Sequence, residues 1–282
     1  MTAKLLDGKA AAAAWEAELA AKLKTLPSSP KLALVRVGDD PASGIYVKKK
    51  IEMCAKLGIE SELIHLPADT TSDQLDSKIS ALNADKSVDG ILVQVPLPKQ
   101  IDALDVQKAI HPFKDVDGFG PKSMGYLLMG RPRFVAATPA GIMRLLAHYK
   151  LDVGGKHCVV VGRSNIVGKP LAILLLQADA TVTIAHSKTK DLAAITKQAD
   201  FLFTAVGKAG LIKKDMVKKG VVIVDVGMNK NEKGKSCGDV DFDSVSPLAS
   251  FITPVPGGVG PMTIMSLMAN TIKAYELQNA KK

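Results

Sequence analysis

The chain has 282 residues, which is about two domains' worth at roughly 150 residues per domain. Its 47% hydrophobic and 23% charged residues are ordinary for a globular protein that buries a full core in each half. No segment approaches the ~20 uninterrupted apolar residues of a membrane helix, and the N-terminus lacks a signal or transit pattern. We therefore expect a cytoplasmic protein with no membrane partner.

The net charge of +9 indicates affinity for polyanions. Nucleic acid is one candidate, but the sequence has no aromatic-rich strand motif and no basic helix suited to a groove. A small polyanionic substrate or cofactor explains the charge at least as well, so we expect no nucleic-acid partner. The three cysteines, Cys54, Cys158 and Cys237, are scattered and no histidine stands at metal spacing, which favours reduced structural thiols and no metal site.

Strand and helix patterns alternate along the chain, which predicts an α/β fold with largely parallel sheets. In the first half, a short strand and an amphipathic helix open the chain. We then expect strands at 31–37, 61–66 and 90–95, a helix from Ser43 to Leu57, and a helix spaced on Leu75, Ile79 and Leu82. The stretch from Lys99 to Ala137 is weakly patterned and is predicted to form the floor and rim of a site.

In the second half, Thr138 and Pro139 indicate a helix N-cap followed by proline at the first helical position. After this helix we expect strands at 157–161, 180–185, 200–206 and 221–226, with helices at 168–177 and 191–198. A final helix after Pro261 is expected to return to the first domain. The predicted domains are 1–139, completed by the helix 265–282, and a Rossmann-type domain over 140–264.

The turn from Gly162 to Gly168 joins an apolar strand to an apolar helix, as in dinucleotide-binding units. Gly162 would form the tight turn, Gly168 would allow close packing, and the helix N-terminus would face a diphosphate. Ser164 stands where the second glycine of the usual pattern would be, so the motif gains its weight from lying between a clear strand and a clear helix.

The next expected strand ends at Ala185 and continues into His186-Ser187-Lys188-Thr189-Lys190, where NAD-binding proteins usually carry an acid for the ribose 2′-hydroxyl. Hydroxyls and cations at this point, with Arg163 nearby in the turn, favour a 2′-phosphate and hence NADP. The alternative is that Lys188 and Lys190 are solvated loop charges.

Lys50 occupies an unexpected place on its helix. On a wheel that starts at Tyr46, it falls at about 40°, in the middle of the apolar arc, whereas Lys48 and Lys49 lie on the opposite side. A lysine there must pair, snorkel or take part in chemistry. Partial desolvation would lower its pKa, which suits a group that transfers protons.

Three other features carry weaker signals. Gln94 is a polar residue at the end of an apolar strand, where α/β proteins place ligands, although it could be an edge-facing amide. Asp115 and Asp117 could simply cap a turn. The glycine- and proline-rich segment 253–263 suits close approach of a ligand, an interdomain hinge, or both.

Taken in chain order, these motifs resemble the bifunctional methylenetetrahydrofolate dehydrogenase/methenyltetrahydrofolate cyclohydrolase family. The resemblance spans nearly the whole chain, and no single motif would suffice. Its carriers are YVKKK (46–50), DGILVQVPLP (89–98), KDVDGF (114–119), TPAG (138–141), VVVGRSNIVGKP (159–170), HSKT (186–189), VDVGMN (224–229) and PVPGGVGPMT (254–263).

The resemblance implies a two-domain homodimer with the folate in a cleft between an N-terminal catalytic domain and an NADP domain. It makes Lys50 the catalytic lysine, Gln94 its hydrogen-bond partner, Tyr46 the residue that orients the pterin, and Asp117 the acid that holds the pterin ring. The implied substrate-binding positions are Tyr46, Val93, Gln94, Val95, Asp117, Pro256, Gly257, Gly258 and Gly260. The implied cofactor-binding positions are Gly162, Arg163, Ser164, Val167, Ser187 and Met228. Two positions depart from many relatives: Ala137 replaces a cysteine and Met228 replaces an isoleucine, and we expect activity to survive both.

The implied reaction oxidises 5,10-methylenetetrahydrofolate with NADP and then hydrolyses the methenyl product to 10-formyltetrahydrofolate. Lys50 would assist proton transfer in the second step. Two rival readings are an NADP dehydrogenase for another small substrate, and a non-catalytic nucleotide-binding module whose basic surface meets nucleic acid. A substrate panel would test the first, and a salt-dependent gel shift would test the second.

Overall fold

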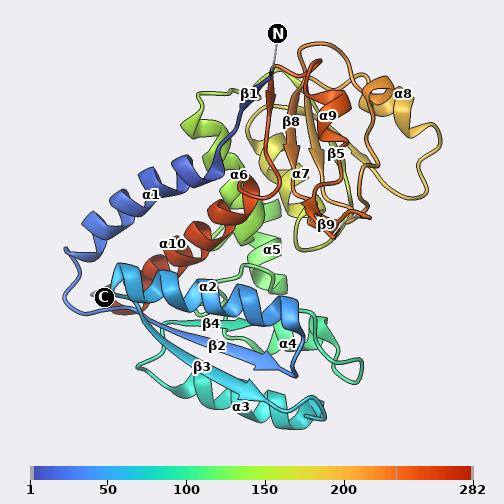
Figure 1. Cartoon of the computed structure of the whole chain (residues 1–282). Coiled ribbons are helices and arrows are strands. Elements are labelled where there is room, and N and C mark those ends of the chain that lie inside the picture. Colours follow the sequence, from blue (N-terminus) through green and yellow to red (C-terminus); the bar gives the residue numbers. More distant parts are fainter. Residues whose placement is uncertain (1–2, 233, 281–282) are drawn as a thin grey trace. The chain divides into compact units, whose positions relative to one another are not determined.

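The computed structural model describes residues 3–232 and 234–280, which form two compact units. We call residues 15–137 and 264–280 the N-terminal unit, and residues 3–14 and 138–263 the central unit. Both consist of helices packed on parallel strands (Figure 1), so the predicted two-domain α/β fold is confirmed. Within the described residues, no helix has both the length and the apolar character needed to cross a bilayer.

The N-terminal unit is built on a three-stranded parallel sheet in the order β3-β2-β4, in which Leu34 pairs with Leu63 on one side and Leu92 on the other. Helix α2 lies over one face of this sheet and α3 over the other (Figure 1). The elements are β2 (Lys31–Val37), α2 (Pro41–Leu57), β3 (Glu60–Leu66), α3 (Ser72–Ala84), β4 (Gly90–Val93), α4 (Ala103–Ala109) and α5 (Pro121–Leu128).

The core beneath α3 follows from the two periodicities of the sequence. Alternate residues of β2 point to one face of the sheet, and residues three or four apart on α3 point back at them. The shared core therefore contains Ala33, Val35 and Val37 with Leu75, Ile79 and Leu82. The predicted apolar face of this helix is confirmed, and α3 begins with a capping box between Thr71 and Gln74.

The central unit contains a six-stranded parallel sheet in the order β1-β11-β8-β7-β5-β6, together with a small antiparallel pair. Continuous apolar runs form its inner strands, as expected for a parallel sheet covered on both faces. The elements are β1 (Lys4–Leu5), β5 (His157–Val161), α7 (Gly168–Gln177), β6 (Thr181–Ala185), α8 (Leu192–Thr196), β7 (Phe201–Thr204), a 3₁₀ turn (Lys214–Met216), β8 (Val222–Asp225), β9 (Asn229–Lys230), β10 (Ser236–Cys237), α9 (Phe242–Val245) and β11 (Phe251–Ile252).

Residues 3–14 belong to the central unit, which differs from the N-terminal domain bounds of 1–139 expected from the sequence. Strand β1 pairs with β11, with Lys4 opposite Phe251 and Leu5 opposite Ile252. Such a pairing joins segments more than 240 residues apart in the sequence, so no local pattern predicts it.

Three helices contain a boundary between the units: α1 (Gly8–Leu23), α6 (Ala137–His148) and α10 (Val259–Asn279). Helix α6 starts at Ala137, so the predicted N-cap role of Thr138 is wrong; its hydroxyl lies 3.0 Å from that of Thr263. Helix α10 likewise starts two residues before Pro261 rather than after it. Proline is tolerated throughout the first turn of a helix because the N–H groups there have no partner within the helix, and its position therefore does not fix the first residue.

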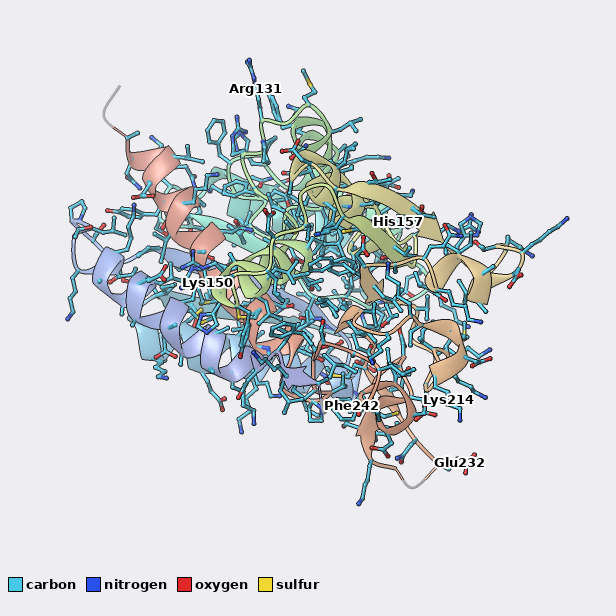
Figure 2. The ribbon with its side chains drawn as sticks, turned by 90° about the horizontal axis from the view of Figure 1, so that it is seen from above. Arg131, Lys150, His157, Lys214, Glu232 and Phe242 are labelled. Atoms are coloured by element: carbon cyan, nitrogen blue, oxygen red, sulfur yellow. The ribbon has the colours of Figure 1, made fainter. Side chains whose placement is uncertain are left out.

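The excess positive charge is spread over both units. Arg131, from the loop after α5, and Lys214, from the 3₁₀ turn of the central unit, are both exposed (Figure 2). Because the cations are distributed in this way, the net charge alone does not mark a binding surface.

Candidate active site

Helix α2 positions Tyr46 and Lys50 one turn apart on the same face. The helix begins at Pro41, where the Asp40 carboxylate accepts a 2.7 Å hydrogen bond from Ser43 N, and it ends at Leu57, followed by Gly58 in the left-handed conformation. Lys50 is only 9% exposed and lies among the buried residues Val47 and Cys54. The anomaly seen on the helical wheel is therefore real: this lysine is inside the protein.

The lysine is held by Gln94, which follows the last residue of β4. Lys50 Nζ donates to Gln94 Oε1 at 2.9 Å, while Gln94 Nε2 donates to the carbonyl of Val95 at 2.6 Å. The second bond fixes which end of the amide faces the lysine. Gln94 N also donates to Val35 O at 2.8 Å, which anchors this residue to the central strand of the sheet. The peptide bond between Val95 and Pro96 is cis.

Two acids in the turn 114–120 have different tasks. The buried Asp115 carboxylate accepts hydrogen bonds from Gly118 N at 3.1 Å, Gly120 N at 2.9 Å and Ser123 Oγ at 2.6 Å, so it shapes the turn. Asp117 receives no such bonds from the residues that the structure describes. Burial raises the pKa of Asp117 to about 6, and the positive charge of Lys50 acts in the opposite direction.

The same electrostatic coupling acts on the lysine. Burial lowers the pKa of Lys50 below its ordinary value, with the negative charge of Asp117 opposing the effect. A lysine with a lowered pKa is neutral in a larger fraction of molecules near neutral pH and can accept a proton. Burial also raises the pKa of Tyr46, so its hydroxyl stays protonated.

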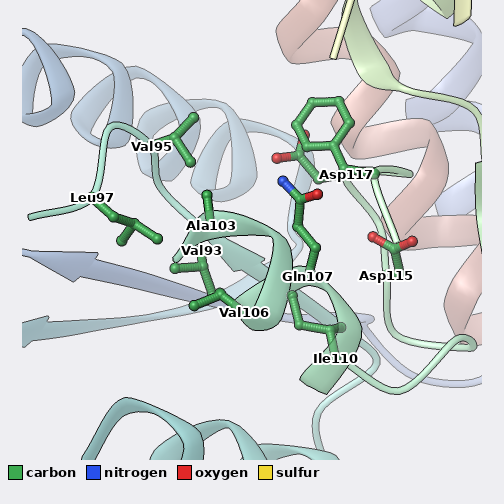
Figure 3. A pocket seen from close by; sticks show the side chains of 10 residues that line it. Val93, Val95, Leu97, Ala103, Val106, Gln107, Ile110, Asp115 and Asp117 are labelled. Atoms are coloured by element: carbon green, nitrogen blue, oxygen red, sulfur yellow. The ribbon is translucent and has the colours of Figure 1, made fainter. Parts of the chain in front are cut away.

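A small pocket in the N-terminal unit is lined by Asp115 and Asp117 together with apolar side chains (Figure 3). Val93 and Val95 form part of the wall, and the Asp117 carboxylate and the Gln107 carboxamide provide polar atoms. The full lining consists of Val93, Val95, Leu97, Ala103, Val106, Gln107, Ile110, Asp115, Asp117 and Phe119. Mostly apolar walls with a few polar groups are typical of the lining of small-molecule sites.

The turn between β5 and α7 fits a dinucleotide diphosphate. Gly162 has φ 139°, and a Cβ on Gly168 would lie 2.6 Å from the carbonyl carbon of Gly162, so both positions require glycine. Ser164 Oγ accepts from Val167 N at 3.1 Å and Gly168 N at 3.3 Å, which explains a serine in place of the second glycine. The backbone N–H groups of residues 164–166 find no acceptor within the described chain and are available to an anion.

Side chains around this turn suit an additional phosphate. Arg163 is exposed and forms no ion pair with any described residue. Strand β6 runs parallel to β5 and ends at Ala185, whose carbonyl accepts from Gly162 N at 2.8 Å. Ser187 and Lys188 therefore follow directly beside the glycine turn, and both are exposed. The 2′-phosphate pocket expected from the sequence is compatible with this arrangement.

The remaining predicted positions also lie in the central unit. Met228 follows β8 and is 54% exposed. Pro256, Gly257 and Gly258 form the loop before α10, with a cis bond between Val255 and Pro256, whereas Gly260 lies in the first turn of that helix. The N-terminal unit holds Tyr46, Lys50, Val93, Gln94, Val95 and Asp117, and each unit thus contains a coherent subset of the predicted site.

A buried pair of acids in the central unit was not predicted. Asp239 accepts from the backbone N–H groups of Val206 at 2.7 Å and Lys208 at 2.8 Å, so it holds the loop after β7. Asp225, at the end of β8, accepts from Val240 N at 2.8 Å and Asp239 N at 3.0 Å. The sequence offers one signal for this pair, which is Asp225 at the end of the apolar strand β8. That signal does not predict the burial of Asp239.

Comparison with known proteins decides the family. Residues 6–117 match the catalytic domain of tetrahydrofolate dehydrogenase/cyclohydrolase, and residues 136–279 match its NAD(P)-binding domain. The chain belongs to the tetrahydrofolate dehydrogenase/cyclohydrolase family. A bifunctional protein FolD from Geobacillus thermodenitrificans is 54% identical over 284 residues, which cover 100% of both chains.

Solved structures of relatives agree with this assignment. The bifunctional FolD enzyme of Campylobacter jejuni has a TM-score of 0.94 and 49% identity, covering 97% of this chain and 99% of that one. The Trypanosoma brucei methylenetetrahydrofolate dehydrogenase-cyclohydrolase, solved with NADP and an inhibitor, has a TM-score of 0.94 and 34% identity over 100% of both chains. The family expected from the sequence motifs is confirmed.

The family assignment gives meaning to the division between the units. The match to the family's catalytic domain contains Tyr46, Lys50 and Gln94 and ends at Asp117, the last of the four side chains expected to carry chemistry. The match to its NAD(P)-binding domain contains the glycine turn and the end of β6. Family membership and local geometry thus agree on which unit contains which set of residues.

Proposed function

We propose that this chain is a bifunctional folate enzyme. It oxidises 5,10-methylenetetrahydrofolate to 5,10-methenyltetrahydrofolate with NADP, and hydrolyses the product to 10-formyltetrahydrofolate. The observation that carries the proposal is the buried Lys50 side chain, whose Nζ donates to Gln94 and interacts electrostatically with Asp117, in a chain that also has a glycine turn fit for a dinucleotide. Family membership supports both activities.

The first step places few demands on side chains. The chemistry that NADP supplies when bound is acceptance of a hydride from the methylene carbon, which leaves the substrate as the methenyl cation. Gly162, Gly168 and the free N–H groups of residues 164–166 would bind its diphosphate, and Arg163, Ser187 and Lys188 its 2′-phosphate. Val167, at the N-cap of α7, and the exposed Met228 would complete the cofactor site.

The second step needs proton transfer. Water forms a bond to the methenyl carbon and loses a proton; the hydroxyl then loses its proton, the bond from carbon to N5 breaks, and N5 gains a proton. Neutral Lys50 would accept the first proton and return one to N5, so that one proton in all is released to solvent. Gln94 orients the lysine through its amide, whose direction is fixed by the bond to Val95 O.

The remaining residues of the site would bind the folate. Asp117 would accept hydrogen bonds from the N–H groups of the pterin ring, and Tyr46 would orient the ring from α2. Val93 and Val95 offer apolar contact to its face. The loop with Pro256, Gly257, Gly258 and, in the helix, Gly260 would contact the substrate through its backbone. A homodimer belongs to the same proposal; it rests on the family resemblance, and sedimentation velocity would test it.

An absorbance assay tests the function directly. Purified protein is mixed with methylenetetrahydrofolate and NADP, and NADPH and methenyltetrahydrofolate are followed together. We expect NADPH to form without lasting accumulation of the methenyl compound, and a separate assay on methenyltetrahydrofolate to exceed spontaneous hydrolysis. If the methenyl compound accumulates, the chain lacks the proposed cyclohydrolase activity. If neither NADP nor NAD is reduced, the proposal is wrong. Activity on another substrate in a panel would favour the rival dehydrogenase.

A further inference from the structure

The turn after β6 is held in shape by its own residues. His186 N donates to Thr189 Oγ1 at 2.8 Å, and Thr189 N donates to His186 O at 2.8 Å. Lys188 N donates to His186 Nδ1 at 3.2 Å. Thr189 and His186 are half-buried, whereas Ser187 and Lys188 between them are exposed. The turn is thus a closed frame that presents two polar side chains outward.

The presented side chains are not used elsewhere in the structure. Neither Ser187 Oγ nor Lys188 Nζ forms a hydrogen bond or ion pair with any of the residues described. The frame also adjoins the glycine turn, because Ala185, the residue before His186, pairs with Val161 and accepts from Gly162 N. A phosphate on the ribose of a dinucleotide bound at Gly162 would therefore meet these two side chains.

We propose that Thr189 is the positioning residue for recognition of the 2′-phosphate. Its hydroxyl does not touch the cofactor; it accepts from His186 N and so keeps Ser187 and Lys188 directed at the phosphate. This inference rests on the proposed use of NADP. Loss of the Thr189 hydroxyl leaves the His186 N–H without its acceptor and lets the turn open, so that the two side chains must be ordered again at each binding event.

The inference predicts a selective effect. A ligand without the 2′-phosphate makes no use of the turn, and its affinity should not change. A residue that merely stabilised the unit would affect ligands with and without the phosphate equally. The ratio of the two affinities therefore separates positioning from structural support.

The test is calorimetric binding of adenosine 2′,5′-bisphosphate and adenosine 5′-monophosphate to the full chain. In Thr189→Val, which keeps the shape and loses the hydroxyl, we expect affinity for the bisphosphate to fall about tenfold, the equivalent of one hydrogen bond. Affinity for the monophosphate should stay within about twofold, and Thr189→Ser, which keeps the hydroxyl, should restore most of the preference.

Thr181→Val is the matched control, since Thr181 is exposed at the start of β6, the strand that leads into the turn, and its hydroxyl makes no hydrogen bond to the described chain. Its ratio of affinities should equal that of the wild type. Equal losses for both ligands in Thr189→Val, no loss for either, or a wild type without preference for the bisphosphate would each overturn the inference. A wild type that shows the preference but does not oxidise methylenetetrahydrofolate would overturn the proposed function and leave this inference standing.

Discussion

Replacement of Lys50 by methionine should separate the two activities. The substitution keeps an unbranched side chain of similar length and removes the ammonium. Because Lys50 is only 9% exposed, the methionine would remain in the same apolar surroundings, beside Val47 and Cys54. The fold has little reason to change, and the site loses one charge and one hydrogen-bond donor.

The size of the effect can be worked from the contacts. Gln94 Oε1 loses its donor at 2.9 Å, which costs about 1–3 kcal/mol, while removal of a buried charge offsets part of this loss. Stability should therefore change little. Proton transfer by a positioned side chain contributes about 10²–10⁴ in rate, or about 3–5 kcal/mol of barrier. We expect the cyclohydrolase rate to fall by at least about 100-fold and the dehydrogenase rate by less than about tenfold.

The assay measures hydrolysis of methenyltetrahydrofolate and formation of NADPH separately, and calorimetry measures NADP binding. Lys49→Met is the matched control, because Lys49 is the adjacent residue and is exposed. It should behave as the wild type in all three measurements. Full cyclohydrolase activity in Lys50→Met, with NADP binding intact, would refute the role of Lys50 in proton transfer.

Two further substitutions test the partners of the lysine and the cofactor turn. Gln94→Glu places a carboxylate beside Nζ, which should raise the pKa of Lys50 by roughly 1–3 units and move the corresponding limb of the cyclohydrolase pH profile to higher pH. An unmoved limb would show that another group titrates. Gly168→Ala puts a Cβ 2.6 Å from the carbonyl carbon of Gly162, which cannot yield, so NADP affinity should fall more than about tenfold in calorimetry. Hydrolysis of methenyltetrahydrofolate should continue, and equal loss of both would indicate general unfolding.

The sequence was sufficient wherever local pattern and tertiary packing agree. The helix 168–177 was predicted with the bounds the structure gives it, because a glycine turn precedes it and an apolar face continues through it. Lys50 was singled out in the same way: a charge in the apolar arc of α2 was expected to pair, snorkel or take part in chemistry, and the structure shows it buried and bonded to Gln94. The residues of α3 that pack into the core were predicted because apolar residues recur three or four positions apart along this helix.

The failures come from contacts that no local window contains. Threonine is a common N-cap residue, yet helix α6 starts before Thr138. The Thr138 hydroxyl instead lies beside that of Thr263, which is 125 residues away in the sequence. Strand β1 has only two residues, and its pairing with β11 decides to which unit it belongs. Asp239 lies in a short loop, where an acid is usually exposed. Here it is fully buried and accepts hydrogen bonds from backbone N–H groups of the loop after β7.

The two sites rely on different parts of the chain for physical reasons. The pKa of Lys50 is lowered by burial, and the bond to Gln94 fixes the position of Nζ; a helix packed on a sheet keeps both constant. A diphosphate, by contrast, needs several N–H groups at close range, which only backbone near glycine can offer. The Lys50 site should therefore be sensitive to the loss of the lysine nitrogen. The glycine turn should be sensitive to the addition of a Cβ. Lys50→Met and Gly168→Ala are opposite perturbations in this sense, and each should leave intact the activity that the other removes.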